Sequence, residues 1–113
     1  MIEYWHNPRC SKSRAGLALL QERGADLRVR RYLDDPPTVD ELATARAALG
    51  NPPVIDMMRR GESLFGNLGL AGADDTALMA AMAAHPILIE RPLAIRGPRA
   101  VIGRPPERLL DLL

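Results

Sequence analysis

The stretch His6-Asn7-Pro8-Arg9-Cys10-Ser11-Lys12-Ser13-Arg14 contains the only cysteine of the chain and runs directly into a helical pattern. Upstream, residues 1–5 are mostly apolar and aromatic, as a buried first strand would be. Downstream, the alanines and leucines of residues 15–20 predict a helix that ends at Gly24. We therefore expect Cys10 to lie where a strand passes into a helix.

The surroundings of this cysteine favour an ionised thiol. Free N–H groups in the first turn of a helix, together with the positive end of its dipole, stabilise an anion, which can be a thiolate or a bound oxyanion. A free thiol has a pKa of about 8.5, and cationic neighbours at such a position lower it. The loop supplies polar and cationic side chains at Asn7, Arg9, Lys12 and Arg14. We interpret the loop as one that activates the thiol.

A buried structural cysteine is the alternative, since a free cysteine often behaves as a small core residue. The flanking sequence argues against it. Asn-Pro before the thiol and Ser-Lys-Ser-Arg after it are typical of an exposed turn. A reactive thiol explains this context better than a core residue does.

Composition narrows the class of protein. A chain of 113 residues, 47% hydrophobic and 26% charged, is expected to form one globular domain. Its 15 basic and 14 acidic residues are spread along the chain and predict no nucleic-acid partner. One cysteine, no leader-like segment and no apolar run near the ~20 residues that span a bilayer fit a cytoplasmic protein without a membrane partner. No metal site is predicted, because His6, Cys10 and His85 lack ligand spacing.

The first half of the chain reads as strand, helix, strand, helix. Residues 27–33 predict a second strand, which the short crossover places parallel to the first. After a turn at residues 34–37, Thr38 and Glu41 form a capping box that opens a second helix. That helix is expected to end at Gly50.

The middle of the chain, about 53–85, has almost no strand pattern and predicts a helical insertion. We expect a short helix over 54–61, an irregular segment over 64–70 and a further helix opened by Asp74-Asp75. Pro86 is predicted to end this last helix.

The pattern changes again after the insertion. Residues 92–96 and 99–103, joined by Gly97-Pro98, predict an antiparallel hairpin. A last helix then starts at Pro105 and buries its leucines, which are Leu109, Leu110, Leu112 and Leu113. This order predicts an α/β fold: a thioredoxin-like mixed four-stranded sheet flanked by helices, with the helical insertion between the second and third strands of a single domain spanning 1–113.

Four segments together resemble the glutaredoxin-coupled arsenate reductases, the ArsC family. They stand in the family's order and at its distances, and the likeness covers nearly the whole chain. The segments are the cysteine loop, Leu68-Gly69-Leu70, His85-Pro86-Ile87-Leu88-Ile89-Glu90-Arg91-Pro92 and Ile102-Gly103-Arg104-Pro105-Pro106-Glu107.

The resemblance implies a thioredoxin-like enzyme that reduces arsenate to arsenite, with glutathione as co-substrate, glutaredoxin as partner and no bound cofactor. The family's catalytic thiolate matches Cys10. Its histidine before Asn-Pro, which helps to lower the thiol pKa, matches His6, and its hydroxyl in the first helical turn matches Ser13. Because Cys10 is the sole thiol, external thiols must complete the reaction.

Three arginines bind the arsenic oxyanion in the family, and they match Arg59, Arg91 and Arg104. The last two are identified by their Arg-Pro contexts. Arg60 adjoins Arg59, so the choice between these two stays open. Arginine is suited to this role because its planar fork binds tetrahedral oxyanions, although compositional bias is the alternative explanation for so many arginines.

Two alternatives belong to other classes. Spx-type regulators share the fold and bind RNA polymerase without turnover, but those with a redox switch use Cys-x-x-Cys, whereas Ser13 stands at the second position here. A monothiol glutaredoxin or glutathione transferase has no need of three oxyanion arginines.

Pro92 is expected to be a cis-proline facing the thiol, as is usual in thioredoxin-like folds. The alternative is a plain proline at the start of a strand.

Overall fold

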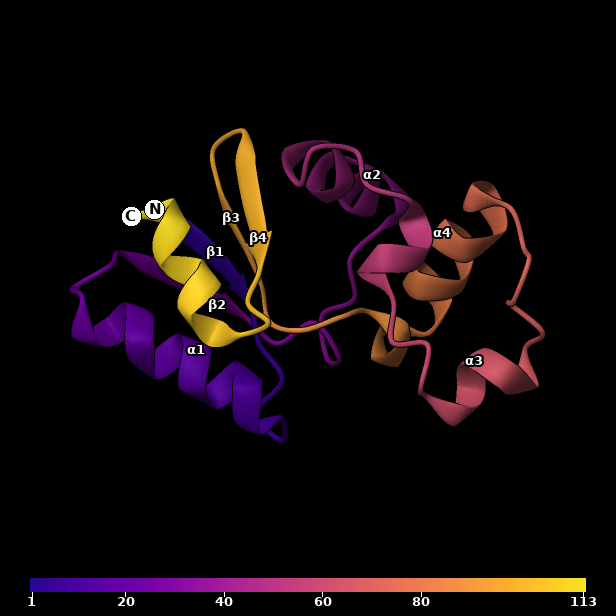
Figure 1. Ribbon diagram of the computed structural model, residues 1–113, viewed down its shortest axis with the longest axis horizontal. Coiled ribbons are helices and arrows are strands. Elements are labelled where there is room, and N and C mark those ends of the chain that lie inside the picture. The colour runs from indigo at the N-terminus through magenta and orange to yellow at the C-terminus, as the bar shows by residue number, and fades with distance from the viewer. The chain divides into compact units, whose positions relative to one another are not determined.

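The computed structural model describes all 113 residues, which form two compact units (Figure 1). The sheet unit comprises Met1–Asp35 and Arg91–Leu113, and the helical unit comprises Pro36–Glu90. All four strands lie in the first unit. The insertion expected at about 53–85 is thus part of a longer helical unit, which also includes the helix after Thr38.

The sheet has the strand order β2-β1-β3-β4. The central strand β1 pairs parallel with β2 and antiparallel with β3, and β3 pairs antiparallel with β4. This mixed sheet confirms the predicted thioredoxin-like fold class. The strands are β1 (Ile2–Trp5), β2 (Leu27–Arg30), β3 (Leu93–Arg96) and β4 (Arg99–Ile102).

The second strand is shorter than the predicted 27–33. It ends at Arg30, because the carbonyl of Arg31 accepts hydrogen bonds from the N–H groups of Asp34 (3.0 Å) and Asp35 (2.9 Å). These bonds close a turn that takes residues 31–34 out of the ladder.

Two helices cover one face of this sheet. Figure 1 shows α1 (Ser11–Glu22) beside the C-terminal helix η3 (Pro106–Leu112). The η3 helix contacts β3 and β4, and α1 contacts β1 through Gly16 and Tyr4. The core of the unit lies between the helices and the sheet. Its buried members are Ile2, Tyr4, Leu20, Ala94, Leu109 and Leu112.

The last helix differs from the prediction in type and buried face. It is a 3-10 helix, in which residues three apart eclipse one another, so Leu109 and Leu112 share the buried face. Leu110 is only half-buried and Leu113 is 49% exposed, against the expectation that both are buried. An α-helical period was the wrong assumption for this segment.

Two glycines allow the elements of this unit to approach closely. A Cβ at Gly16 would lie 2.5 Å from the Tyr4 hydroxyl oxygen and 2.6 Å from a Leu109 methyl carbon. A Cβ at Gly103 would lie 2.9 Å from the ring of Pro92. The middle of α1 therefore packs against β1, and the segment after β4 packs against Pro92, at distances that a side chain would prevent.

The predicted hairpin of β3 and β4 is confirmed, with Gly97 at a φ of 56° in its turn. Two of its arginines bind backbone carbonyls of the last helix. Arg96 donates from Nη1 to the carbonyl of Leu112 at 2.7 Å, and Arg99 donates from Nη2 to that of Asp111 at 2.6 Å. These bonds satisfy carbonyls that the end of η3 leaves free.

The helical unit begins with α2 (Val39–Ala48), which opens on the predicted capping box. Two details of the middle segment differ from the prediction. Residues 54–61 hold only the 3-10 helix η1 (Val54–Met57), and the segment expected to be irregular contains α3 (Ser63–Asn67). This short helix buries Phe65, a tertiary contact that Gly66 and the neighbouring glycines conceal in the sequence.

The unit continues with α4 (Asp75–Ala84), where Asp74 accepts a hydrogen bond from the N–H of Ala77 at 2.8 Å. The 3-10 helix η2 (Pro86–Leu88) follows, so Pro86 ends α4 as predicted.

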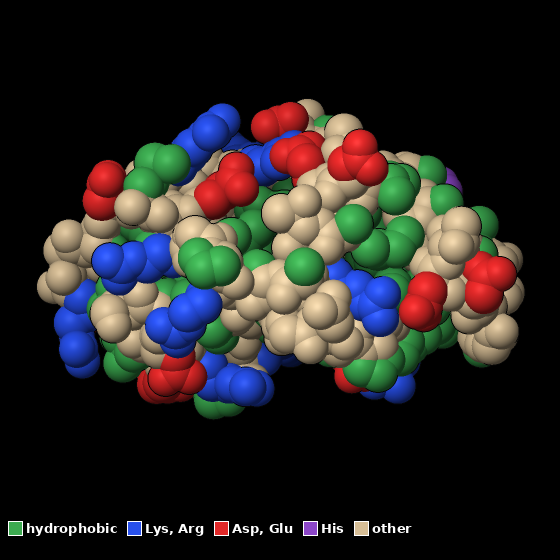
Figure 2. Space-filling model, turned by 90° about the horizontal axis from the view of Figure 1, so that it is seen from above, with side chains coloured by type: hydrophobic (Ala, Val, Ile, Leu, Met, Phe, Trp, Pro, Cys, Tyr) green, Lys and Arg blue, Asp and Glu red, His purple; other side chains and the backbone are tan.

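None of the helices has both the length and the apolar character that crossing a membrane requires. Figure 2 shows acidic and basic side chains scattered over the viewed face, in keeping with a net charge of +1.

Candidate active site

Cys10 is the N-cap residue of α1, as predicted, and its side chain makes no capping hydrogen bond. Its backbone is held on both sides: its N–H donates to the carbonyl of Asn7 at 3.0 Å, and its carbonyl accepts from the N–H of Arg14 at 3.0 Å. The residue is partly exposed. The backbone is thus fixed while the sulfur stays available for chemistry.

Ser13 is the centre of a buried hydrogen-bond network below the thiol. Its Oγ lies 2.8 Å from Nδ1 of His6 and accepts from the N–H of Asn7 at 3.0 Å. Three of the residues that the sequence singled out, His6, Asn7 and Ser13, are therefore brought into contact. All three are buried.

Tyr4 joins this network and was missed from the sequence. Its hydroxyl donates to the carbonyl of Ser13 at 2.7 Å, and its ring centroid lies 5.8 Å from that of His6. The signal that could have found it is the period of two in a strand, which extends the face of Ile2 and Tyr4 to His6. Burial raises the pKa of Tyr4, so its hydroxyl stays a donor.

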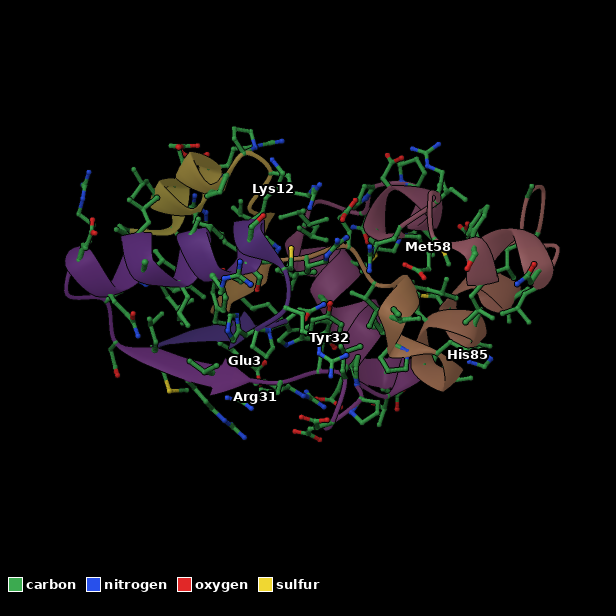
Figure 3. All side chains as sticks on the ribbon, turned by 90° about the horizontal axis from the view of Figure 1, so that it is seen from below. Glu3, Lys12, Arg31, Tyr32, Met58 and His85 are labelled. Atoms are coloured by element: carbon green, nitrogen blue, oxygen red, sulfur yellow. The ribbon has the colours of Figure 1, made fainter.

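Two hydrogen bonds hold the turn ahead of the thiol, one from the Arg14 side chain and one from the backbone of Arg9. Arg14 donates from Nη1 to the carbonyl of Pro8 at 2.9 Å, and the N–H of Arg9 donates to Oδ1 of Asn7 at 3.0 Å. These bonds stabilise the turn ahead of the thiol. Arg9 and Lys12 are exposed, and Figure 3 shows Lys12 at the first turn of α1.

Two of the three predicted oxyanion arginines meet in the sheet unit. Arg104 donates from Nη1 to the carbonyl of Arg91 at 3.2 Å, and both residues are half-buried. The Arg91–Pro92 bond is cis, as expected, and Arg104–Pro105 is also cis, which the sequence did not indicate. The arginines thus lie on paired segments on either side of the hairpin.

The pKa of the Cys10 thiol is lowered. Burial alone would raise the pKa, but it is outweighed by hydrogen bonds from the backbone N–H groups of Ser13 and Lys12 and by the charge and a hydrogen bond of the Arg91 guanidinium. The hydrogen-bond donors to the thiol are therefore the first turn of α1 and Arg91, which is far from Cys10 in the sequence. The cationic side chains of the loop are not among the groups that lower the thiol pKa.

The pKa of His6 is also lowered, first by burial and then by the charges of Arg31 and Arg14. The ring is therefore neutral at pH 7 and interacts with Ser13 as a hydrogen-bonding group rather than as a cation. Nowhere in the structure do three or more His, Cys, Asp or Glu side chains gather in a way that could hold a metal ion.

Arg59 belongs to the helical unit, where it is 23% exposed and its Nη1 lies 3.2 Å from Oε2 of Glu62. Its N–H donates to the carbonyl of Leu88 at 2.8 Å. Arg60 is 62% exposed and lies 3.6 Å from a carboxylate oxygen of Asp56. The two adjacent arginines thus have different surroundings, and Arg59 has the more constrained one.

Comparison with known proteins gives a consistent result. The model of the ArsC family matches residues 5–112. An arsenate reductase from Neisseria meningitidis is 46% identical over 114 residues, covering 99% of this chain and 97% of that protein. One from Haemophilus influenzae is 42% identical, covering 96% of each. The solved structure of an arsenate reductase from Vibrio cholerae is 46% identical, with a TM-score of 0.96 over 99% of this chain and 97% of that one.

Proposed function

The chain belongs to the ArsC family, and from this premise we propose that it reduces arsenate to arsenite, with glutathione as co-substrate and glutaredoxin as partner. One observation carries the proposal: a thiol of lowered pKa has the first-turn N–H groups of α1 and the guanidinium of Arg91 directed at it. A nucleophile and anion-binding donors are therefore available at the same point. Relatives named arsenate reductase, similar over their whole length, support the choice of substrate.

Substrate binding follows from the charge of arsenate, which at neutral pH is an anion resembling phosphate. Arg91 and Arg104 supply guanidinium forks, and the start of α1 supplies N–H groups. We assign Arg59 as the third arginine because it is the more constrained member of its pair. In this role the arginines also stabilise the charge that moves during thiolate attack.

The chemistry begins with attack of the Cys10 thiolate on arsenic, which forms a sulfur–arsenic bond and releases one oxygen as water. Glutathione displaces a second oxygen in the same way. The thiolate of glutaredoxin then attacks the glutathione sulfur, and the electron pair of the sulfur–arsenic bond stays on arsenic, which is thereby reduced from As(V) to As(III). Hydrolysis of the remaining bond releases arsenite and the Cys10 thiolate, while the mixed disulfide of glutaredoxin and glutathione leaves.

His6 and Ser13 act as positioning residues in this scheme. Because His6 is neutral, it contributes through its hydrogen bond to Ser13 rather than through charge. Ser13 in turn holds Asn7, and with it the loop that carries the thiol. The network keeps the N–H groups of the first turn directed at the sulfur. The requirement for glutathione is in keeping with a reducing cytoplasm.

The test is arsenate-dependent consumption of NADPH in the presence of glutathione, glutathione reductase and glutaredoxin. We expect consumption that needs arsenate, both thiol components and the enzyme, and that Cys10→Ser abolishes. Each component is omitted in turn as a control. A well-folded protein that consumes no NADPH with arsenate contradicts the proposed activity and favours the Spx-like binding role.

A further inference from the structure

A pocket beside the cysteine loop contains charged groups that the mechanism above does not use. It has a volume of about 420 Å³ and is lined by residues 6–9 of the loop and by Arg31, Leu33 and Asp34. This volume falls within the roughly 300–1,000 Å³ typical of small-molecule sites. All of its lining residues belong to the sheet unit.

Three charged residues line the pocket: Arg9, Arg31 and Asp34. All three are exposed, and none takes part in an ion pair. The neighbouring pair behaves differently, since Nε of Arg30 lies 3.3 Å from a carboxylate oxygen of Asp35. Charges of both signs are thus left available at one small site.

The two pocket residues that follow β2 sit on a closed turn. The N–H of Asp34 donates to the carbonyl of Arg31 at 3.0 Å. Figure 3 shows Arg31 beyond β2, on the side of the sheet away from α1, whereas Lys12 lies at the start of that helix. The pKa of His6 is lowered first by burial and then by the charge of Arg31, so that charge also reaches the loop. The turn therefore presents its charges next to the loop without belonging to the thiol's own donor set.

This combination of charges selects a class of ligand. A simple anion would be attracted by the two guanidinium groups but repelled by Asp34. A simple cation would be attracted by Asp34 but repelled by the two guanidinium groups. An α-amino-acid group satisfies both, because its carboxylate accepts hydrogen bonds from a guanidinium fork while its ammonium donates to a carboxylate.

We propose that this pocket binds the α-amino-acid end of the thiol co-substrate, with Arg31 and Arg9 on its carboxylate and Asp34 on its ammonium group. The inference rests on the proposed function, in which glutathione delivers a thiol at Cys10. Glutathione has such an end in its γ-glutamyl group. The pocket is close enough to serve it, since Asn7 lines the pocket and its carbonyl accepts the N–H of Cys10 at 3.0 Å.

Length also agrees with this assignment. A tripeptide spans about 10 Å when extended. The sulfur lies on the central residue, so the γ-glutamyl end has part of this length with which to reach a pocket whose lining includes the four residues directly before Cys10. The pocket consequently acts as a specificity site for the co-substrate rather than for arsenate.

The test uses thiol–disulfide exchange and needs neither arsenate nor glutaredoxin. The Cys10 thiolate attacks one sulfur of glutathione disulfide, forming a Cys10–glutathione mixed disulfide and releasing one glutathione thiolate. Mass spectrometry of quenched samples gives the rate. Two further probes are the disulfide of glutaryl-cysteinyl-glycine, which lacks only the ammonium group, and hydroxyethyl disulfide, which lacks charge.

We expect Arg31→Ala to slow the reaction with glutathione disulfide by about threefold to tenfold, as for loss of a solvent-accessible guanidinium–carboxylate contact. The same variant should react normally with hydroxyethyl disulfide. Asp34→Asn should slow the reaction with glutathione disulfide but not the reaction with the glutaryl-cysteinyl-glycine disulfide. Arg28→Ala removes an exposed arginine of β2 outside the pocket and should change no rate.

Two results would overturn the proposal. One is an unchanged rate with glutathione disulfide in both pocket variants. The other is an equal slowing with all three probes, which would mean a general effect on the thiol through His6. Circular dichroism checks that each variant is folded. If selectivity for the γ-glutamyl end is found in a protein that does not reduce arsenate, the pocket assignment stands and the proposed function fails.

Discussion

The cysteine loop and the segment from Arg91 to Arg104 both contribute positive charge, but they use it differently. In the loop, Arg14 binds a backbone carbonyl, and Arg9 and Lys12 are exposed. In the second segment, Arg91 and Arg104 are half-buried, Arg104 donates to the carbonyl of Arg91, and Arg91 joins the N–H of Ser13 in lowering the pKa of the thiol. Cations next to the thiol in sequence are thus not the ones that act on it.

The physical reason is solvation. Water weakens the field of an exposed side chain, whereas a half-buried guanidinium acts through a lower dielectric and is held in one direction. Backbone N–H groups at a helix start are also fixed in direction. The difference between the two regions therefore predicts an order of mutational effects, from loss of the thiol to shifts in its ionisation.

The largest effect is expected for Cys10→Ser, which removes the nucleophile that both regions serve. Turnover in the coupled assay should disappear, because serine is not ionised at neutral pH and no other thiol is present. The far-ultraviolet circular dichroism spectrum should be unchanged, since the Cys10 side chain makes no capping hydrogen bond. Residual turnover by this variant would rule out the thiolate mechanism.

Arg91→Ala should reduce kcat/KM by about 10²–10³-fold, the usual cost of one lost oxyanion donor. Arg91→Lys should remain impaired, because an ammonium keeps the charge but not the fork. The comparison variant is Lys12→Ala, for which we expect only a severalfold loss, since its side chain is exposed. Equal losses for Arg91→Ala and Lys12→Ala would break the contrast between the regions.

Arg59→Ala should lower kcat/KM by about 10²-fold if it is the third oxyanion arginine, whereas Arg60→Ala should have a much smaller effect. The two residues are adjacent and chemically identical, so Arg60→Ala is the matched control for Arg59→Ala. Because Arg59 is bound to Glu62, Glu62→Gln is included to detect a purely local effect. The reverse order of losses would assign the third arginine to Arg60.

Gly103→Ala should destabilise the protein by about 1–3 kcal/mol, the usual cost of overpacking a tight contact. The new methyl group would lie 2.8 Å from the Leu109 side chain and 2.9 Å from the ring of Pro92, so one of these neighbours would have to move. Denaturant unfolding measures this loss, and the matched control is Gly61→Ala, which has open space around it. No difference between the two variants would show that the close approach at Gly103 is dispensable.

The smallest effects concern the ionisation of the thiol. Because the folded protein lowers the pKa of Cys10, iodoacetamide labelling should reach half its maximum rate below the free-thiol value of about 8.5. Arg91→Ala should move this midpoint upward, and Arg9→Ala should move it less. A wild-type midpoint at or above the free-thiol value would contradict the assigned donors.

The same shift has a consequence for stability. A group whose pKa is lower in the folded state stabilises the protein above its unfolded pKa, and this contribution is lost as the pH falls through the folded pKa. The difference in melting temperature between wild type and Cys10→Ser should therefore become more favourable to wild type as the pH rises through that window. A pH-independent difference would mean that the thiolate is not stabilised by the fold.

The sequence by itself determined the elements that depend on neighbours a few residues apart. The capping box of Thr38 and Glu41, the hairpin around Gly97 and the position of Cys10 at the start of a helix each need only local hydrogen bonds or backbone freedom. The parallel pairing of β1 and β2 follows from a short crossover. For these features, the local conformational preference of the sequence agrees with the structure that tertiary packing stabilises.

Only the tertiary structure decided the features that join distant segments. The hydrogen bond of Tyr4 to Ser13, the bond of Arg104 to Arg91 and the action of Arg91 on Cys10 have no local signal, because the partners lie in different elements. The 3-10 form of the last helix is likewise set by packing, since eclipsed Leu109 and Leu112 fit the space over the sheet. The loop sequence therefore identifies Cys10 as the reactive thiol, but its pKa depends on Arg91, which only folding brings close to it.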